Sequence, residues 1–271
     1  MATPSPPRPS PPRLSPSRRV TLAIGLVFSL GTIGTGALYL VHQLGRASYQ
    51  EQATLDSPAT RLLTVHTGGG DVTVRASPDD QVHVTADVRY GVTRPRLTHL
   101  SAPDGVLVRA DCQGFLLLAS CSVDYTIAVP ADFAIRADSR GGDIHALDGL
   151  AGVVTLNTGG GDLTVSGARG SLDLHTGGGS IRGTDLHCAE VVAETGAGNV
   201  ILTFSDAPQQ VSTVVGAGNV VVEVPATASY RVDASTGAGR STVGISNDLT
   251  SPRLIRAHSG AGNVTVRPVA G

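Results

Sequence analysis

Tryptophan is absent from the 271-residue sequence, and only four phenylalanines and five tyrosines are present. Lysine is absent too, so arginine supplies all 20 basic residues. The first 50 residues contain five of these arginines and no acidic residue, which leaves the rest of the chain acidic on balance. Nucleic-acid binding normally needs a basic patch and aromatic rings on which bases stack. The composition therefore excludes a nucleic-acid-binding protein.

The motifs of common enzyme and cofactor sites are also missing. The sequence has no CxxC pair, HExxH, GxSxG, Walker loop or dinucleotide-binding fingerprint. Glycine triplets occur, but no helix pattern follows them, and a phosphate cradle uses the backbone N–H groups of a helix start. We therefore predict a non-enzymatic protein with no catalytic, cofactor-binding or metal-binding residues and no cofactor.

One long apolar run lies near the N-terminus, where Val20–Val41 comprises 22 residues without a charge. At about 1.5 Å per residue, a helix of this length crosses a hydrocarbon core of about 30 Å. Four arginines precede the run and one follows closely, which by the positive-inside rule predicts a cytoplasmic N-terminus. The alternative is a cleaved signal peptide, with Gly45 and Ala47 as the small residues of the cleavage site. A signal peptide has a shorter apolar core, of about 7 to 15 residues, which favours a signal anchor.

The anchor divides the chain into four predicted parts. These are a disordered, proline- and arginine-rich cytoplasmic tail (1–19), a transmembrane helix (20–41), a linker (42–58) and an exterior β-strand-repeat domain (59–269). The predicted location is the bacterial cell membrane, with a single pass and the C-terminal domain outside the cytoplasm.

A glycine-rich repeat dominates the exterior part. Eight copies share an alternating segment, a glycine turn, a polar junction residue and a second alternating segment. The copies are VHTGGGDVTV (65–74), ADSRGGDIHA (137–146), LNTGGGDLTV (156–165), LHTGGGSIRG (174–183), AETGAGNVIL (193–202), TVVGAGNVVV (213–222), ASTGAGRSTV (234–243) and AHSGAGNVTV (257–266).

The spacing of the copies predicts the fold class. From Asp143 onward, successive junction residues lie 19, 18, 19, 20, 21 and 23 residues apart, which suits two short strands and two turns per coil. Apolar residues alternate on both sides of each turn, as in Leu156 and Leu163, so stacked coils would bury one continuous face. We predict an all-β fold, a β-solenoid resembling a parallel β-helix, opened by β hairpins within residues 75–136.

The last glycine before the junction is present in every copy, which is typical of a turn that needs positive φ. The middle position accepts alanine, which indicates a need for a small residue, and the junction residue is expected to close the bend by turn hydrogen bonding. A serine or threonine four residues before the junction, replaced once by Val215, is expected to bond along the stack or to the turn. The predicted turn glycines are Gly70, Gly142, Gly161, Gly179, Gly198, Gly218, Gly239 and Gly262.

The three cysteines agree with an exterior location. Cys112 and Cys121 flank the segment QGFLLLAS, which we interpret as a hairpin whose arms bring the sulfurs within bonding distance. Cys188 is left over, either buried and inert or paired between molecules.

The order VDYTIAVPADFAIRADSRGGDIHALDGLAGVVTLNTGGGDLTV, followed by VEVPATASYRVDASTGAG and SGAGNVTV, resembles a bacterial β-strand-repeat family of unknown function labelled "putative adhesin". The resemblance covers roughly residues 60–268. It implies a membrane-anchored envelope protein with a β-repeat domain, in a family sometimes associated with envelope-stress systems, and it implies no catalytic residues.

Three groups of residues suggest a binding or catalytic site, and each also has a purely structural interpretation. Calcium binding would suit glycine-aspartate turns, but the acid is not retained in all copies. Asp143 and Asp162 would stack as a glycosidase-like carboxylate pair, but aromatic surface to hold a sugar is scarce. A stripe containing His66, His175 and His258 would bind metal weakly, whereas a solvated polar face is the favoured interpretation.

The sequence therefore predicts an exterior binding, adhesin-like or scaffolding module. The alternatives are an accessory sensor in an envelope-stress pathway and, least favoured, a wall-polysaccharide-active enzyme. Expected partners are the membrane, through residues 20–41, and another envelope protein, a wall polymer or a second copy.

Overall fold

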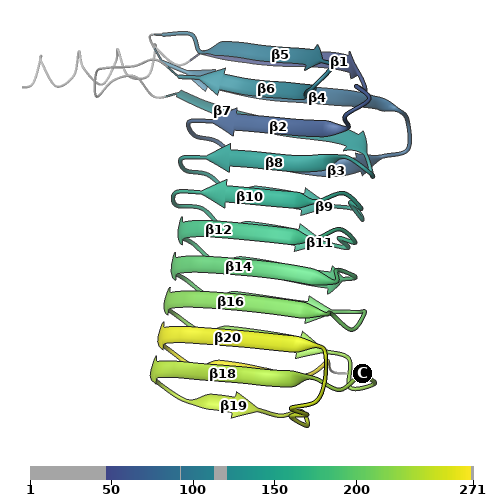
Figure 1. Ribbon diagram of the computed structural model, residues 1–271. Coiled ribbons are helices and arrows are strands. Elements are labelled where there is room, and N and C mark those ends of the chain that lie inside the picture. Colours follow the sequence, from purple (N-terminus) through teal and green to yellow (C-terminus); the bar gives the residue numbers. More distant parts are fainter. Residues whose placement is uncertain (1–46, 92, 113–120, 270–271) are drawn as a thin grey trace, which may run out of the picture. The chain divides into compact units, whose positions relative to one another are not determined.

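The structure is a computed structural model that describes residues 47–91, 93–112 and 121–269, in which the chain forms 21 strands arranged as two mixed β-sheets (Figure 1). Within these residues the protein is all-β, and no helix long and apolar enough to span a membrane is found there. The predicted tail and transmembrane helix, residues 1–41, lie outside the described residues.

Sheet A has 11 strands. In spatial order they are β1 (Ala47–Asp56), β4 (Gln81–Tyr90), β7 (Cys121–Pro130), β3 (Val72–Ser77), β9 (Ile144–Leu147), β11 (Leu163–Ser166), β13 (Ile181–Leu186), β15 (Val200–Phe204), β17 (Val220–Val224), β21 (Val264–Pro268) and β19 (Ser241–Val243).

Sheet B has 10 strands. In spatial order they are β18 (Arg231–Ala238), β20 (Leu254–Ala261), β16 (Gln210–Ala217), β14 (Glu190–Ala197), β12 (Leu172–Gly178), β10 (Val154–Thr158), β8 (Ala134–Ser139), β2 (Leu62–Thr67), β6 (Gly105–Asp111) and β5 (Arg96–Ala102).

Each repeat places one strand in sheet B and the next in sheet A, and equivalent strands of neighbouring repeats pair in parallel, with one register shift in sheet A between Gly183 and Leu186. Leu156 pairs with Leu174 in sheet B, and Leu163 pairs with Ile181 in sheet A. These four side chains are fully buried between the sheets. Because alternate residues of a strand point to opposite faces, the apolar positions of all coils form one continuous core.

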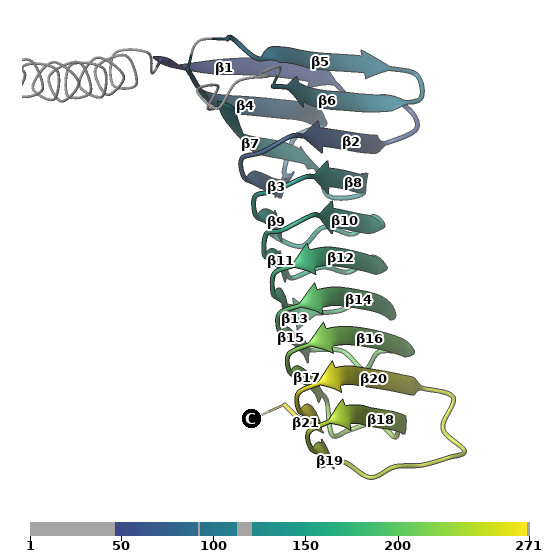
Figure 2. The same ribbon diagram turned by 90° about the vertical axis from the view of Figure 1, so that its left-hand side faces the viewer.

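The repeats do not stack in sequence order at the C-terminal end. The last repeat, β20 and β21, lies between β16/β17 and β18/β19 in both sheets, as Figure 2 shows. A long connection leads from β19 back to β20 (Figure 2). The outermost repeat is the least apolar one, since Ser241 occupies the core-facing place of Val264 and is exposed. A polar terminal repeat is what the open end of a stack requires.

Residues 75–136 build the opposite end, as the alternation predicts. β5 and β6 form an antiparallel hairpin, while β1, β4 and β7 pair antiparallel in sheet A. The predicted linker boundary is wrong, because residues 47–56 form β1. Its side chains Tyr49, Ala53 and Leu55 alternate along the strand and pack against the core.

Side chains cover part of the free edge of β18. Asn247 accepts a hydrogen bond from the backbone N–H of Val232 at 2.9 Å and donates one to the same residue's carbonyl at 3.1 Å. Ser241 donates to the carbonyl of Ala234 at 2.9 Å. An edge strand with satisfied backbone groups is a poor template for pairing with another chain.

Candidate functional site

The third glycine of each turn, which all eight copies share, is required mainly by the close approach of neighbouring coils. Positive φ is found at six of the eight predicted turn glycines, with values from 103° to 147°, but not at Gly161 and Gly179. The positive-φ explanation is therefore wrong for these two. At all eight positions a Cβ atom would overlap a backbone carbonyl of the adjacent coil; at Gly161 this is the carbonyl of Gly142.

The middle turn position has open space, in contrast to the predicted need for a small residue. A Cβ at Gly160 or Gly178 would meet no atom within 4 Å. Alanine is therefore accepted there because it contacts nothing. The third glycines of the turns, by contrast, stack closely on one another from coil to coil. We call this column the glycine spine.

The polar junction residue links coils rather than closing its own bend. In each coil the junction N–H donates to the side-chain oxygen of the equivalent residue in the neighbouring coil, at distances from 2.7 to 3.3 Å. In order of stacking the ladder comprises Asp124, Asp71, Asp143, Asp162, Ser180, Asn199, Asn219, Asn263 and Arg240. Any short side chain with an acceptor oxygen serves, which explains why aspartate, asparagine and serine interchange.

Arg240 identifies the end of this ladder. Its backbone N–H donates to Asn263 at 3.0 Å, but no described strand of sheet A lies beyond β19, so its side chain need not accept. If the coils stacked in sequence order, Arg240 would lie inside the stack, and the N–H of Asn263 would have no side-chain acceptor. The unusual residue was therefore a usable signal for the exchanged order of the last two coils.

We predict that Asp162→Ala will lower the free energy of unfolding by about 1 kcal/mol, because the Ser180 N–H loses its acceptor at 2.7 Å. Asp162→Asn keeps an oxygen and should restore most of the loss. Arg240→Ala is the matched control and should change the denaturation midpoint little. Equal losses in Asp162→Ala and Arg240→Ala, measured by chemical denaturation, would contradict the ladder.

We call the serine and threonine side chains four residues before each junction the hydroxyl column. They satisfy carbonyls of the glycine spine. Thr158 donates to the carbonyl of Gly142 in the neighbouring coil at 3.1 Å, and Thr176 donates likewise to Gly161 at 2.9 Å. Thr67 instead bonds within its own turn, to Gly69 at 3.1 Å. Both predicted bonding modes therefore occur, and the column is structural.

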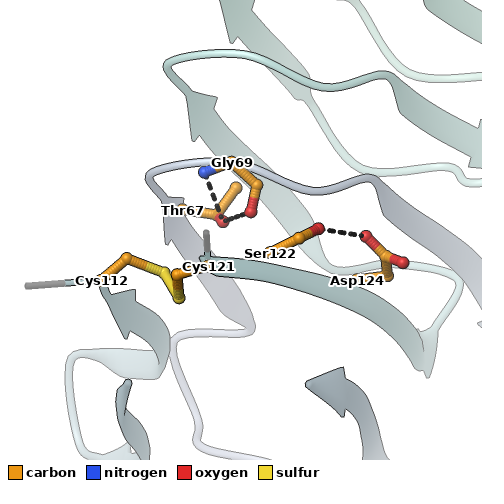
Figure 3. Close-up of a disulfide and its surroundings, with 6 residues drawn as sticks. All are labelled: Thr67, Gly69, Cys112, Cys121, Ser122 and Asp124. Atoms are coloured by element: carbon orange, nitrogen blue, oxygen red, sulfur yellow. Dashed lines mark hydrogen bonds between the residues drawn. A yellow bond between two sulfur atoms is a disulfide. The ribbon is translucent and has the colours of Figure 1, made fainter. Parts of the chain in front are cut away.

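Cys112 and Cys121 form a disulfide (Figure 3). The expected hairpin is wrong, because Cys112 follows β6 of sheet B whereas Cys121 begins β7 of sheet A. The bond thus joins the two sheets at the side of the stack where the other coils have a glycine turn. Next to it, Asp124 accepts the first N–H of the ladder, that of Asp71. Cys188 is buried, its thiol donates to the Ala168 carbonyl, and burial raises its pKa to about 12, which supports the inert alternative.

Two buried polar rings at the N-terminal end were not identified from the sequence. His99 of β5 and Tyr125 of β7 meet edge to face, with centroids 5.9 Å apart. Burial lowers the pKa of His99 and raises the pKa of Tyr125, so both side chains are held neutral.

The outward face of sheet B displays the predicted histidine stripe within a longer row, which we call the outer row. Its members, from β6 to β18, are Arg109, His66, Asp138, Asn157, His175, Glu194, Val214, His258 and Ser235. The prediction that His175 lies between Asn157 and Glu194 is confirmed. Neighbours are bonded laterally, as Asn157 donates to Asp138 at 2.9 Å, and His175 lies 3.3 Å from Glu194.

The stacked carboxylates Asp143 and Asp162 have a structural role. The Asp143 carboxylate accepts the N–H of Asp162 at 2.8 Å, so these two residues belong to the ladder. Among the described residues, no group of three or more histidine, cysteine, aspartate or glutamate side chains is placed to hold a metal ion.

A hollow of about 370 Å³ opens at the N-terminal end of the outer row. We call it the Gly68 notch. Its floor is His66, Thr67 and Gly68, at and just after the end of β2, and its walls come from the ends of β6 and β8 and the residue that follows each strand. The wall residues are Arg109, Ala110, Asp111, Cys112, Asp138, Ser139 and Arg140.

Charged side chains in the notch are partly paired. Arg109 donates from Nε to both carboxylate oxygens of Asp111, at 2.9 and 3.1 Å, and this hydrogen bonding lowers the pKa of Asp111. Asp138 lies 3.5 Å from His66 and 3.4 Å from Arg136. Within the described part of the chain, no ion pair is formed by Arg140.

The chain is similar to several solved bacterial structures at low sequence identity. No protein-family model matches the chain, and no curated protein matches it. A "putative adhesin" from Parabacteroides distasonis is 17% identical with a TM-score of 0.44, over 82% of this chain and 97% of that one. A "putative adhesin" from Bacteroides fragilis is 15% identical with a TM-score of 0.41, over 82% and 97%. A "putative cell adhesion protein" from Clostridium sporogenes is 11% identical with a TM-score of 0.38, over 82% and 100%.

Proposed function

We propose that the protein is a single-pass, membrane-anchored β-solenoid of the bacterial cell envelope that acts as a non-enzymatic, adhesin-like binding module. The anchor is the apolar run 20–41, with the N-terminus in the cytoplasm and the repeats outside it. Parallel coils stacked in register support the solenoid assignment.

The observation that carries the binding role is the outer row. The core, the glycine spine, the hydroxyl column and the junction ladder each meet a need of the fold. The outward side chains of sheet B meet none of these needs, and they change from Asp138 to Asn157 to His175 between adjacent coils. Strands about 4.8 Å apart present these groups as a regular, flat polar surface, which suits a protein or polymer partner.

The test is crosslinking pull-down with mass spectrometry on cells that make the tagged full-length protein. One variant carries Asp138→Thr, His175→Thr and Glu194→Thr on sheet B. The matched control carries Arg75→Thr, His145→Thr and Arg182→Thr, which all lie on the outward face of sheet A. Threonine suits exposed strand positions, so both variants should fold.

We expect specific partners to be recovered with the wild type and the sheet A variant, and to be lost with the sheet B variant. Recovery of the same partners with all three proteins would contradict the role of the outer row. Recovery of the protein alone would contradict the binding function and favour a self-assembling structural element.

A further inference from the structure

We propose that the Gly68 notch binds the carboxylate groups of an acidic polysaccharide, with Arg140 as the residue that holds the carboxylate. This inference rests on the proposed binding function and names the ligand chemistry of one part of the same face.

Arg140 breaks the repeat pattern at a position where the fold does not require an arginine. It occupies the first turn position, which is glycine in the seven other copies. The stacking of the coils uses only the backbone of Arg140: its N–H donates to the carbonyl of Thr67, and its own carbonyl closely approaches Gly159. The long cationic side chain therefore has no part in the stacking of the coils, and it lines the notch.

The shape of the notch follows from the residue that faces Arg140. Gly68 has no side chain, and a Cβ atom there would meet nothing within 4 Å. The glycine thus leaves a gap between the wall formed by Arg109 and Asp111 and the wall formed by Asp138 and Arg140. A polymer can lie across such an open hollow, whereas an enclosed small-molecule site would have to surround its ligand.

The charges favour an anion at one point and hydroxyl groups beside it. Arg109 is held by Asp111, and Asp138 is shared by Arg136 and His66. Arg140 is then the cation left for the ligand, and a guanidinium matches a carboxylate with two parallel hydrogen bonds. The carboxylates of Asp111 and Asp138 accept hydrogen bonds, which a sugar's hydroxyl groups donate.

The lining also indicates which ligands bind poorly. Among the described residues that line the notch, Ala110 is the only aliphatic side chain and none is aromatic. These residues offer a neutral sugar no ring on which to stack and an apolar peptide side chain no pocket. Affinity has to come from the charge, so it should fall as salt is raised.

The experiment measures binding of the full-length protein in nanodiscs to polygalacturonate, dextran and polyglutamate. The wild type should bind polygalacturonate in a salt-sensitive manner, with no binding to dextran and weaker binding to polyglutamate. Arg140→Gly restores the residue of the other copies, and Arg140→Gln removes the charge while keeping a long side chain. Each should weaken polygalacturonate binding by about tenfold or more, as expected for the loss of a charge-assisted hydrogen bond.

Arg182→Thr, on the outward face of sheet A, is the charge-matched control and should bind as the wild type does. Circular dichroism of each variant keeps a folding defect distinct from a binding defect. Unchanged affinity in folded Arg140→Gly and Arg140→Gln would overturn the assignment, as would equal binding of polyglutamate. Absence of polygalacturonate binding, with envelope partners still recovered by the wild type, would overturn the ligand chemistry and leave the binding function standing.

Discussion

Gly161→Ala is expected to lower the free energy of unfolding by about 3 kcal/mol, at the upper end of the usual cost of overpacking. The added Cβ would overlap the backbone carbonyl of Gly142 and contact the N–H of Asp143 in the neighbouring coil. Backbone atoms in a stacked sheet cannot move aside as a flexible side chain does. The two coils would have to separate locally, which also weakens the ladder bond between Asp162 and Asp143.

The matched control is the same substitution one residue earlier. Gly160→Ala places a Cβ where no atom lies within 4 Å, and Ala197 and Ala217 occupy this turn position in other coils. Its effect should stay within about 0.5 kcal/mol, as for surface changes that disturb no feature. Both variants are compared by chemical denaturation followed by circular dichroism. Similar denaturation midpoints for Gly161→Ala and Gly160→Ala would show that the neighbouring coil does not require glycine at position 161.

Removal of the disulfide is expected to cost about 2–4 kcal/mol, through the combined change Cys112→Ser and Cys121→Ser. The bond closes a short loop with a sequence separation of 9 and joins sheet A to sheet B at the end built by residues 75–136. Because contacts in a stacked repeat protein are mostly between neighbours, the loss should be concentrated at this end.

Hydrogen exchange distinguishes that local effect from general unfolding. Amides of β6 and β7 should exchange faster in the double variant, while those of β14 and β15 should keep their protection. Reduction of the wild type should reproduce the pattern, because Cys188 is already a free thiol and the reductant acts on the bond between Cys112 and Cys121. Uniform loss of protection in all coils would contradict a locally acting bond.

Much of the architecture was predictable because its causes are local in the sequence. Alternation such as that around Leu156 and Leu163 requires strands with one buried face, and the spacing of the turns sets the length of a coil. The same alternation was present in residues 47–56, where Tyr49 and Leu55 mark β1, but it was interrupted by charged and amide side chains.

The roles of the turn residues were harder to predict because they depend on the neighbouring coil. Gly161 is needed for contact with Gly142, and Asp162 is needed by the N–H of Ser180. From one copy alone, glycine before aspartate is indistinguishable from an ordinary bend that needs positive φ. Arg140 was visible as the exception to its column, but only the folded chain places it beside Arg109 and the gap at Gly68.

By itself the sequence determined the all-β class, the repeat and its apolar face, because side-chain alternation and turn spacing act within about 20 residues. Tertiary structure alone decided which segments became neighbours: β2 beside β8, β20 between β16 and β18, and Cys112 bonded across the two sheets. The physical reason is that strands of equal length and register are interchangeable partners in a parallel sheet. The order of the coils is therefore decided at the ends of the stack. There a polar coil can face solvent, and a junction residue without an acceptor oxygen leaves no N–H of a further coil unpaired.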